Sequence, residues 1–447
     1  MIILGLGSNL AHRISNLRRG LTLIKSIPNT RVLNVSPLYL SDALLPENTS
    51  PMWDQPYINL ALSCETSLSP DELQTHLKEI EKTVGRKQEK RRWGPRVLDI
   101  DILAWDDLVR KDELLIIPHR DLCERPFALW PLADIAPEWI FPEPGPYQGK
   151  KAAQIVERWG SRFSGEAPLH TRQIPHRIDT AQLVGILNVT PDSFSDGGVF
   201  NDPEEAVRHA QNLVAAGAEI IDIGAESTAP NATPLDAKTE WLRLLPVISS
   251  LENNISTFLI HPKISIDTRH ASVAEKALHY NINWINDVTG LVDPAMRQVL
   301  ANATVDCVVM HHVSIPATRE KIIPREQDPV AYLYQWSEQQ IAMLKQQGIA
   351  EERIILDVGI GFGKSAEQSY MLLKNIKQFK NLGVRLLVGH SRKSFYQLFT
   401  AHPAEARDVE TTVTSLFLDE QGVDYLRIHN VDMCARAFRI KKALFTV

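Results

Sequence analysis

The chain has 447 residues, of which 44% are hydrophobic and 23% charged, and its formal net charge is −6. This length predicts two or three folded domains, and the composition excludes collagen-like, coiled-coil and disordered chains. No apolar run approaches the roughly 18–20 residues of a membrane helix, and no charged segment precedes the short apolar start, so we expect a cytoplasmic protein without membrane contacts. The negative charge argues against a nucleic-acid partner. The four cysteines contain no CxxC pair, which is typical of reduced thiols.

The first third of the chain mixes strand and helix patterns. Apolar alternation predicts strands at residues 1–5, 31–39, 57–63 and 97–104, and amphipathic spacing predicts helices at 17–26 and 69–84. This mixture favours an α+β domain over residues 1–145. Clusters of proline, glycine and polar residues follow, and they predict an interdomain linker over residues 146–180.

Residues 181–447 change to a regular alternation of apolar runs and helix-length segments. Eight such runs predict an α/β TIM (β/α)8 barrel, whose active site lies at the C-terminal ends of its strands. Polar side chains are concentrated at those predicted ends, where a purely structural barrel requires none. They are Asn188, Asp222, Glu226, Asp267, Asn286, Asp287, His311, His312, Asp357, His390, Ser391, Arg427 and His429.

The segment RWGPRVLDIDI at residues 92–102 carries the strongest signal in the first domain. Asp99 and Asp101 lie two residues apart on a predicted strand, so both project from one face and repel each other unless cations lie between them. Carboxylate oxygens favour magnesium. The preceding run from Arg86 to Arg96 is strongly basic and suits phosphate oxygens, so the combination indicates phosphoryl transfer from a nucleotide. A solvated acidic strand beside a solvated basic loop is the structural alternative.

Several motifs extend this signal over nearly all of residues 1–145. They are LGLGSNL (4–10), DQPYIN (54–59), RWGPRVLDIDIL (92–103), IPH (117–119) and RPFALWPL (125–132). In them the chain resembles the 6-hydroxymethyl-7,8-dihydropterin pyrophosphokinases, which have a ferredoxin-like fold.

The resemblance implies specific roles for these residues. It implies that Asp99 and Asp101 hold two Mg2+ ions that bridge the phosphates of the substrate ATP, and that Arg86 and Arg96 stabilise the transferring group. It also implies nucleotide contacts from Glu81, Arg92, His119 and Arg125, and a pterin pocket formed by Asn59, Trp93 and Phe127.

The barrel half carries a second ordered set of motifs. They are GILNVTPDSFSDGG (185–198), AEST (225–228), SIDT (265–268), IND (285–287), DVGIGFGK (357–364), GHSRKS (389–394) and RIHNV (427–431). In them the chain resembles dihydropteroate synthase, which couples 4-aminobenzoate to a dihydropterin diphosphate and releases diphosphate.

This second resemblance also implies residue roles. The diphosphate site contains Asn188 with one Mg2+ ion, Thr228, Arg427 and His429. The pterin site contains Asp267, Asn286, Asp357 and Lys393, and Ser394 opens a helix whose N-terminus helps to bind the aminobenzoate carboxylate. Lys393, Arg427 and His429 are the expected catalytic groups. Ala229 stands where the family usually has an arginine, and Arg269 and Lys238 are candidate replacements.

Together the two halves favour a bifunctional enzyme of folate biosynthesis that makes the dihydropterin diphosphate and then consumes it. The alternative is an active kinase half joined to a barrel that binds pterin but is not a synthase, such as a pterin-dependent methyltransferase or a receptor. Expected ligands are small molecules: the dihydropterin alcohol, ATP and 4-aminobenzoate. Barrels of this kind usually pair through their C-terminal helices, so the resemblance implies a homodimer.

Overall fold

The computed structural model describes residues 1–46, 49–85, 94–189, 203–226, 234–315 and 321–445. The chain forms two compact units, one of residues 1–179 with the C-terminal end from Lys442, the other of residues 180–441. Within the described parts, no helix has both the length and the apolar character needed to cross a membrane. All four cysteines are buried and free, as the sequence predicts for reduced thiols.

The first unit is built on a six-stranded antiparallel sheet with the order β5–β1–β4–β3–β8, and β2 also pairs with β4. The strands are β1 (Ile2–Ser8), β2 (Thr30–Val35), β3 (Leu38–Ser41), β4 (Tyr57–Thr66), β5 (Asp99–Trp105) and β8 (Arg172–Ile174). A separate hairpin joins β6 (Arg110–Lys111) and β7 (Ile116–Ile117).

Helices pack on the sheet of this unit. Helix α1 (Arg13–Lys25) packs tightly at Gly20, where a Cβ atom would lie 2.9 Å from the Leu98 side chain and 3.6 Å from Leu6 on β1. Helix α2 (Pro70–Val84) packs beside it and begins at Ser69, whose backbone N–H donates to Glu72 in a capping box. Helices α3 (Pro126–Ile135) and α4 (Ala152–Val156) share a core with Ile3, Tyr39 and Leu103. An α+β sheet-and-helix unit is therefore present, as the sequence predicts.

Two expectations for this unit need correction. The strand predicted over residues 31–39 is two strands, β2 and β3, because Ser36 and Pro37 interrupt it. Residues 146–179, predicted as linker, are folded onto the first unit: β8 pairs with β3, and Ala152, Ile155 and Val156 are buried in its core. The proline- and glycine-rich composition reflects turns between these short elements rather than a free connection.

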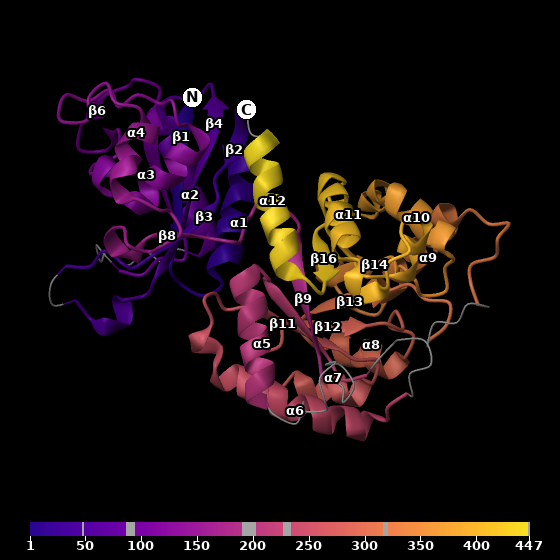
Figure 1. Ribbon diagram of the computed structural model, residues 1–447. Coiled ribbons are helices and arrows are strands. Elements are labelled where there is room, and N and C mark those ends of the chain that lie inside the picture. Colours follow the sequence, from indigo (N-terminus) through magenta and orange to yellow (C-terminus); the bar gives the residue numbers. More distant parts are fainter. Residues whose placement is uncertain (47–48, 86–93, 190–202, 227–233, 316–320, 446–447) are drawn as a thin grey trace. The chain divides into compact units, whose positions relative to one another are not determined.

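The second unit is the predicted barrel, a closed ring of eight parallel strands surrounded by helices (Figure 1). The strands are β9 (Gln182–Asn188), β10 (Ile220–Gly224), β11 (Lys263–Asp267), β12 (Trp284–Asp287), β13 (Asp306–Met310), β14 (Ile354–Asp357), β15 (Arg385–Val388) and β16 (Tyr425–Ile428). The helices are α5 (Pro203–Ala216), α6 (Ala237–Asn253), α7 (Ala271–Ala277), α8 (Pro294–Ala301), α9 (Pro329–Gln346), α10 (Ala366–Lys374), α11 (Asp408–Glu420) and α12 (Val431–Phe445).

The barrel interior begins with one apolar layer. Seven strands contribute to it, with the residues Val184, Ile220, Trp284, Val308, Ile355, Leu387 and Tyr425. Because side chains alternate along a strand, the residue two positions later on each strand also points inward, nearer the C-terminal end. Those positions are Ile186, Asp222, Asn286, Met310, Asp357, Gly389 and Arg427. The alternation of side chains along the strands therefore places polar side chains at the barrel mouth.

Candidate active sites

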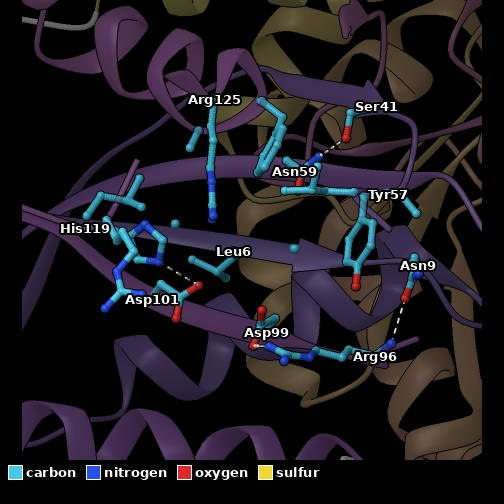
Figure 2. Close-up of a pocket in the computed structure, with 18 of the residues that line it drawn as sticks. Leu6, Asn9, Ser41, Tyr57, Asn59, Arg96, Asp99, Asp101, His119 and Arg125 are labelled. Carbon is cyan, nitrogen blue, oxygen red and sulfur yellow. Dashed lines mark hydrogen bonds and ion pairs between the residues drawn. The ribbon is translucent and has the colours of Figure 1, made fainter. Parts of the chain in front are cut away.

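A cavity of about 500 Å³ opens beside β1, β4 and β5 in the first unit. Its lining brings together residues that are far apart in the sequence, and Figure 2 shows many of them facing a common space. The polar lining includes Asn9, Ser41, Tyr57, Asn59, Arg96, Asp99, Asp101, His119 and Arg125, and Phe127 adds an aromatic ring.

Strand β5 places Asp99 and Asp101 on the same face, with the fully buried Ile100 between them. The strand partners of this pair on β1 are Gly7 and Gly5, which have no side chains to fill the space. A Cβ atom at Gly7 would lie 3.1 Å from the Asn59 Oδ1 atom and 3.4 Å from the Tyr57 ring. The glycines of β1 therefore keep the cavity open opposite the carboxylates.

The electrostatics around the carboxylate pair favour cations. Enclosure from solvent and, second, the charge of Asp99 raise the pKa of Asp101, while His119 opposes this shift. The Nε2 atom of His119 lies 3.9 Å from the Asp101 Oδ2 atom. Arg96 makes an ion pair with Asp99, and its backbone N–H donates to the Asn9 Oδ1 atom at 2.6 Å.

These residues fit Mg2+. Among the described residues, no group of three or more metal-binding side chains is present. Magnesium, however, is commonly held by one or two carboxylates, with water and substrate phosphates supplying the other ligands. Two carboxylates on one strand face, one with a raised pKa, provide such a donor set, because a cation between them removes their repulsion.

The opposite side of the cavity is suited to a flat polar ring. Asn59 is buried on β4, and its Nδ2 atom donates to the Ser41 hydroxyl at 3.0 Å, which fixes the amide orientation. Phe127, in the first turn of α3, lines the same cavity. Asn59 and Phe127, two of the residues predicted for the pterin pocket, therefore line one cavity.

A second constellation lies at the mouth of the barrel. Arg427 on β16 donates from Nε to Asp222 on β10 at 2.6 Å and from Nη2 to Asp267 on β11 at 2.9 Å. Burial lowers the pKa of Arg427, but the two carboxylates outweigh this effect and hold the pKa above its ordinary value. Burial and then the charge of Asp222 raise the pKa of Asp267 to about 8, although Arg427 opposes this shift.

Asp357 and Lys393 form the adjoining part of the mouth. The Asp357 Oδ1 atom accepts from the Gly359 backbone N–H at 2.8 Å. Lys393 places its Nζ atom 4.4 Å from the centre of the Phe362 ring. Burial and then the nearby Arg427 lower the pKa of Lys393 to about 8, while Asp357 and Asp267 oppose the shift. A cation therefore lies over an aromatic ring here, with the Asp357 carboxylate near enough to interact with that cation.

The turn after β14 can approach this site because of a glycine. Gly359 has a φ of +64°, and a Cβ atom there would lie 1.9 Å from the His311 carbonyl oxygen. Only glycine fits this position, both sterically and conformationally. The turn that carries Phe362 therefore lies directly against the end of β13.

The chain matches two family models over these two units. Residues 3–137 match "7,8-dihydro-6-hydroxymethylpterin-pyrophosphokinase", and residues 184–429 match "Pterin binding enzyme". The folate synthesis bifunctional protein of Chlamydia caviae is 36% identical over 435 residues, which covers 96% of this chain and 95% of the relative. The chain belongs to the folate synthesis bifunctional proteins.

Another relative and two solved structures are also similar to this chain. A folate synthesis bifunctional protein of Arabidopsis thaliana is 32% identical and covers 100% of this chain and 96% of its own length. The dihydropteroate synthase of Anaplasma phagocytophilum with bound 6-hydroxymethylpterin-monophosphate is 38% identical, with a TM-score of 0.54, and covers 60% of this chain and 100% of its own. The Thermus thermophilus synthase in complex with 4-aminobenzoate is 35% identical, with a TM-score of 0.52, and covers 60% and 95%.

The chain is therefore a bifunctional enzyme, with a hydroxymethyldihydropterin pyrophosphokinase in the first unit and a dihydropteroate synthase in the second. This result decides against the non-synthase barrel that the sequence left open. The structure also brings most of the predicted site residues together in the two constellations. Arg86, Arg92, Trp93, Thr228 and Ala229 lie outside the described residues.

Glu81 requires a correction. The sequence resemblance placed it at the nucleotide, but its side chain is 1% exposed and is not part of the cavity lining. Its Oε1 atom accepts from the Ile100 backbone N–H at 2.8 Å and from the Lys78 Nζ atom at 2.8 Å. Glu81 therefore supports the strand that carries Asp99 and Asp101, because it lies on the inner face of α2.

Ser394 and Arg269 also differ from expectation. Ser394 begins a 3-10 helix of only five residues (Ser394–Leu398), so the helix dipole expected to aid carboxylate binding is small. Arg269 donates from Nε and Nη2 to Glu226 at 2.8 and 3.0 Å. Glu226 therefore already neutralises the charge of Arg269, so Arg269 is a poor replacement for the arginine that the family usually has at position 229.

The sequence reasoning assigned no role to Asn9 and Lys364, although both lie in motifs it noted. Asn9 accepts from the Arg96 N–H and donates to the Gln55 carbonyl at 3.2 Å, so it joins two walls of the first cavity. Lys364 is buried and donates to the carbonyls of His311 and Phe362 at 3.2 and 3.1 Å, which closes the glycine turn. Burial lowers the pKa of Lys364 to about 7. Their place in the motifs was the available signal, but their partners depend on tertiary structure.

Proposed function

We propose that the cavity residues of the first unit carry the diphosphate transfer. In this reaction the hydroxymethyl oxygen of the dihydropterin bonds to the β-phosphorus of ATP and loses its proton, the bond from that phosphorus to the α,β-bridging oxygen breaks, and AMP leaves. Asn59, Phe127 and Trp93 bind the pterin ring, and Arg92, His119 and Arg125 bind the nucleotide. Arg96 and Arg86 stabilise the transferring group, because cations offset developing charge on the phosphate oxygens.

Asp99 and Asp101 are the proposed ligands of two Mg2+ ions in this site. When bound, these ions neutralise phosphate charge and hold the phosphate oxygens in place for in-line transfer. The support is the shared strand face of the two carboxylates and the raised pKa of Asp101.

For the barrel we propose that one set of residues at the strand ends binds the pterin and that another set assists the departure of diphosphate. The amine nitrogen of 4-aminobenzoate bonds to the exocyclic methylene carbon, the carbon–oxygen bond to diphosphate breaks, and the nitrogen loses a proton. Asp357, Asp267, Asn286 and Lys393 bind the pterin, with the Asp357 carboxylate accepting from its amino-pyrimidinone edge. Ser394 contributes to binding of the aminobenzoate.

The leaving group is the centre of this chemistry, because an aromatic amine is a weak nucleophile. Arg427, His429 and Thr228 are the proposed diphosphate-binding groups, together with Asn188 and one Mg2+ ion. Burial and neighbouring cations, Arg392 first among them, lower the pKa of His429. Arg427 supplies the positive charge that diphosphate needs as its own charge grows.

The observation that carries the proposal is the gathering of Asp267, Asp357, Lys393 and Arg427 around one barrel mouth in a chain that also carries the carboxylate pair. The test is a two-step assay on the full chain with dihydropterin alcohol, ATP, Mg2+ and labelled 4-aminobenzoate. We expect AMP and labelled dihydropteroate. Labelled product from supplied dihydropterin diphosphate, without ATP, isolates the barrel step, and its absence would contradict the assignment of the barrel.

We also propose that the enzyme is a homodimer that pairs through the barrel. Helix α11 presents a regular apolar stripe to solvent, with Val409 64% exposed, Val413 62% and Phe417 38%. This spacing places the three side chains on one helix face, as expected of an interface. Light scattering tests the proposal: we expect a dimer, and a monomeric Val413→Glu variant. A wild-type monomer would contradict it.

We further propose that the enzyme works in the cytoplasm, without nucleic-acid or membrane partners. The support is the negative net charge, the four free cysteines and the small-molecule substrates, which include ATP. Cell fractionation tests this proposal, and recovery of the enzyme from an organelle or membrane fraction would contradict it.

A further inference from the structure

A buried carboxylate contacts the arginine of the proposed diphosphate site of the barrel. Asp222 on β10 is 1% exposed, and it points into the barrel one side-chain layer above the apolar floor. Neither resemblance nor the proposed reaction assigns it a role. A barrel core needs only apolar residues at such a position, and burying a carboxylate is costly unless it is fully hydrogen-bonded.

The contacts of Asp222 join four strands. Its Oδ1 atom accepts from the Ser265 hydroxyl on β11 at 2.6 Å. Its Oδ2 atom accepts from Asn286 Nδ2 on β12 at 3.2 Å and from Arg427 Nε on β16 at 2.6 Å. Asp222 therefore contacts two proposed ligand-binding residues, Asn286 and Arg427, within the same side-chain layer.

These contacts fix the direction of the Arg427 guanidinium. Asp222 holds Nε and Asp267 holds Nη2, and these two carboxylates come from neighbouring strands. The described residues provide no hydrogen bond to the third nitrogen, Nη1. A guanidinium held at two nitrogens cannot swivel about its side chain, so its remaining donors keep one direction.

We propose that Asp222 is a positioning residue of the synthase, which holds Arg427 in the orientation needed to receive the departing diphosphate, with Ser265 holding Asp222 in turn. Asp222 does not reach the substrate itself. The inference rests on the proposed place of Arg427 in the diphosphate site. Since diphosphate gains charge as it leaves, a misdirected Arg427 lowers kcat more than it changes aminobenzoate binding.

The test uses the full chain and supplied dihydropterin diphosphate with 4-aminobenzoate. Asp222→Asn keeps the shape of the side chain but removes its charge, and we expect kcat to fall about tenfold to a hundredfold, the value of a hydrogen bond to a charged group. Ser265→Ala loosens Asp222 indirectly, and we expect a fall of roughly twofold to fivefold. The KM for 4-aminobenzoate should change less than about twofold in both.

Ser337→Ala is the matched control. Ser337 is as buried as Ser265, but its hydroxyl donates within α9, to the Leu333 carbonyl at 2.8 Å. Its loss should leave the synthase kcat unchanged. AMP formation by the first unit, measured on the same samples, should be unaffected in every variant.

A double-mutant cycle with Arg427→Lys separates positioning from general destabilisation. If Asp222 and Ser265 act through Arg427, adding either change to Arg427→Lys should cause little further loss. Effects that multiply, or a wild-type kcat in folded Asp222→Asn, would overturn the inference. If Asp222→Asn does not fold, the cycle of Ser265→Ala with Arg427→Lys tests the inference by the same criterion. An unaffected Arg427→Lys enzyme would instead refute the proposed role of Arg427.

Discussion

Glu81 offers a direct test of how the first active site is supported. Strand β5 lies at the edge of its sheet, so the backbone groups of Ile100 that face away from β1 need partners. The Glu81 Oε1 atom accepts from the Ile100 N–H at 2.8 Å, and the Lys78 Nζ atom donates to the Ile100 carbonyl at 3.3 Å. Ile100 lies between the two carboxylates, so these contacts hold both of them in register.

The expected cost of Glu81→Ala follows from the geometry. The change removes the acceptor of a buried backbone N–H, which costs about 1–3 kcal/mol in the free energy of unfolding. Glu81→Gln retains an amide oxygen that can accept from the Ile100 N–H, and it removes the charge that pairs with the partly exposed Lys78. The hydrogen bond to the backbone is kept, so the loss should be smaller than in Glu81→Ala. Glu81→Ala should therefore impair the first unit clearly, and Glu81→Gln should be close to wild type.

Each unit has its own activity, so the assay reads them separately. AMP formation after incubation in increasing urea reports the first unit, and dihydropteroate formation from supplied diphosphate reports the barrel. We expect the AMP-forming midpoint to fall in Glu81→Ala, with the barrel midpoint unchanged. If Glu81→Gln raises the KM for ATP while leaving the urea midpoint unchanged, Glu81 contacts the nucleotide and the structural role is refuted.

Three further predictions follow from the sites. Asp99→Asn should abolish AMP formation but leave the barrel reaction from supplied diphosphate intact; persistent AMP formation would exclude Asp99 as a metal ligand. Gly7→Ala should raise the KM for the pterin about tenfold, because its Cβ atom crowds Asn59 at 3.1 Å, and an unchanged KM would place the ring elsewhere. Lys393 is charged below its pKa of about 8, so kcat/KM of the synthase should fall as the pH rises through 8. Lys393→Arg should move this fall in kcat/KM to higher pH. An unchanged pH profile would instead assign the fall to titration of Asp267.

The barrel was predictable because its signal is local and repeated. Each strand is a short apolar run with a polar end, and eight such runs have one common closed arrangement. The inward direction of Asn286, Asp357 and Arg427 follows from the strand period alone, since each lies two residues after an apolar interior residue. Their convergence at one mouth thus required no knowledge of specific contacts.

The parts of the first unit that were missed have weaker local signals. Helix α3 contains Pro126 and Pro131, and proline within a helix normally argues against one. Pro126 occupies the first turn, where its missing N–H costs nothing, and burial of Leu129 and Trp130 compensates for Pro131. Strand β8 has only three residues, so its pairing with β3 gives no visible alternation. Tertiary packing, rather than local propensity, decides both elements.

Glu81 and Asp222 show where sequence reasoning ends. Both are nearly fully buried carboxylates, and a buried carboxylate in a sequence pattern is most simply assigned to a ligand. What distinguishes a supporting carboxylate is its partner: the backbone N–H of an edge strand for Glu81, and an arginine from a distant strand for Asp222. Spacing within one element tells which residues share a face, but not which element lies opposite. In both units strand periodicity predicts which strand residues face the site, whereas the residues that orient them depend on the contact between elements.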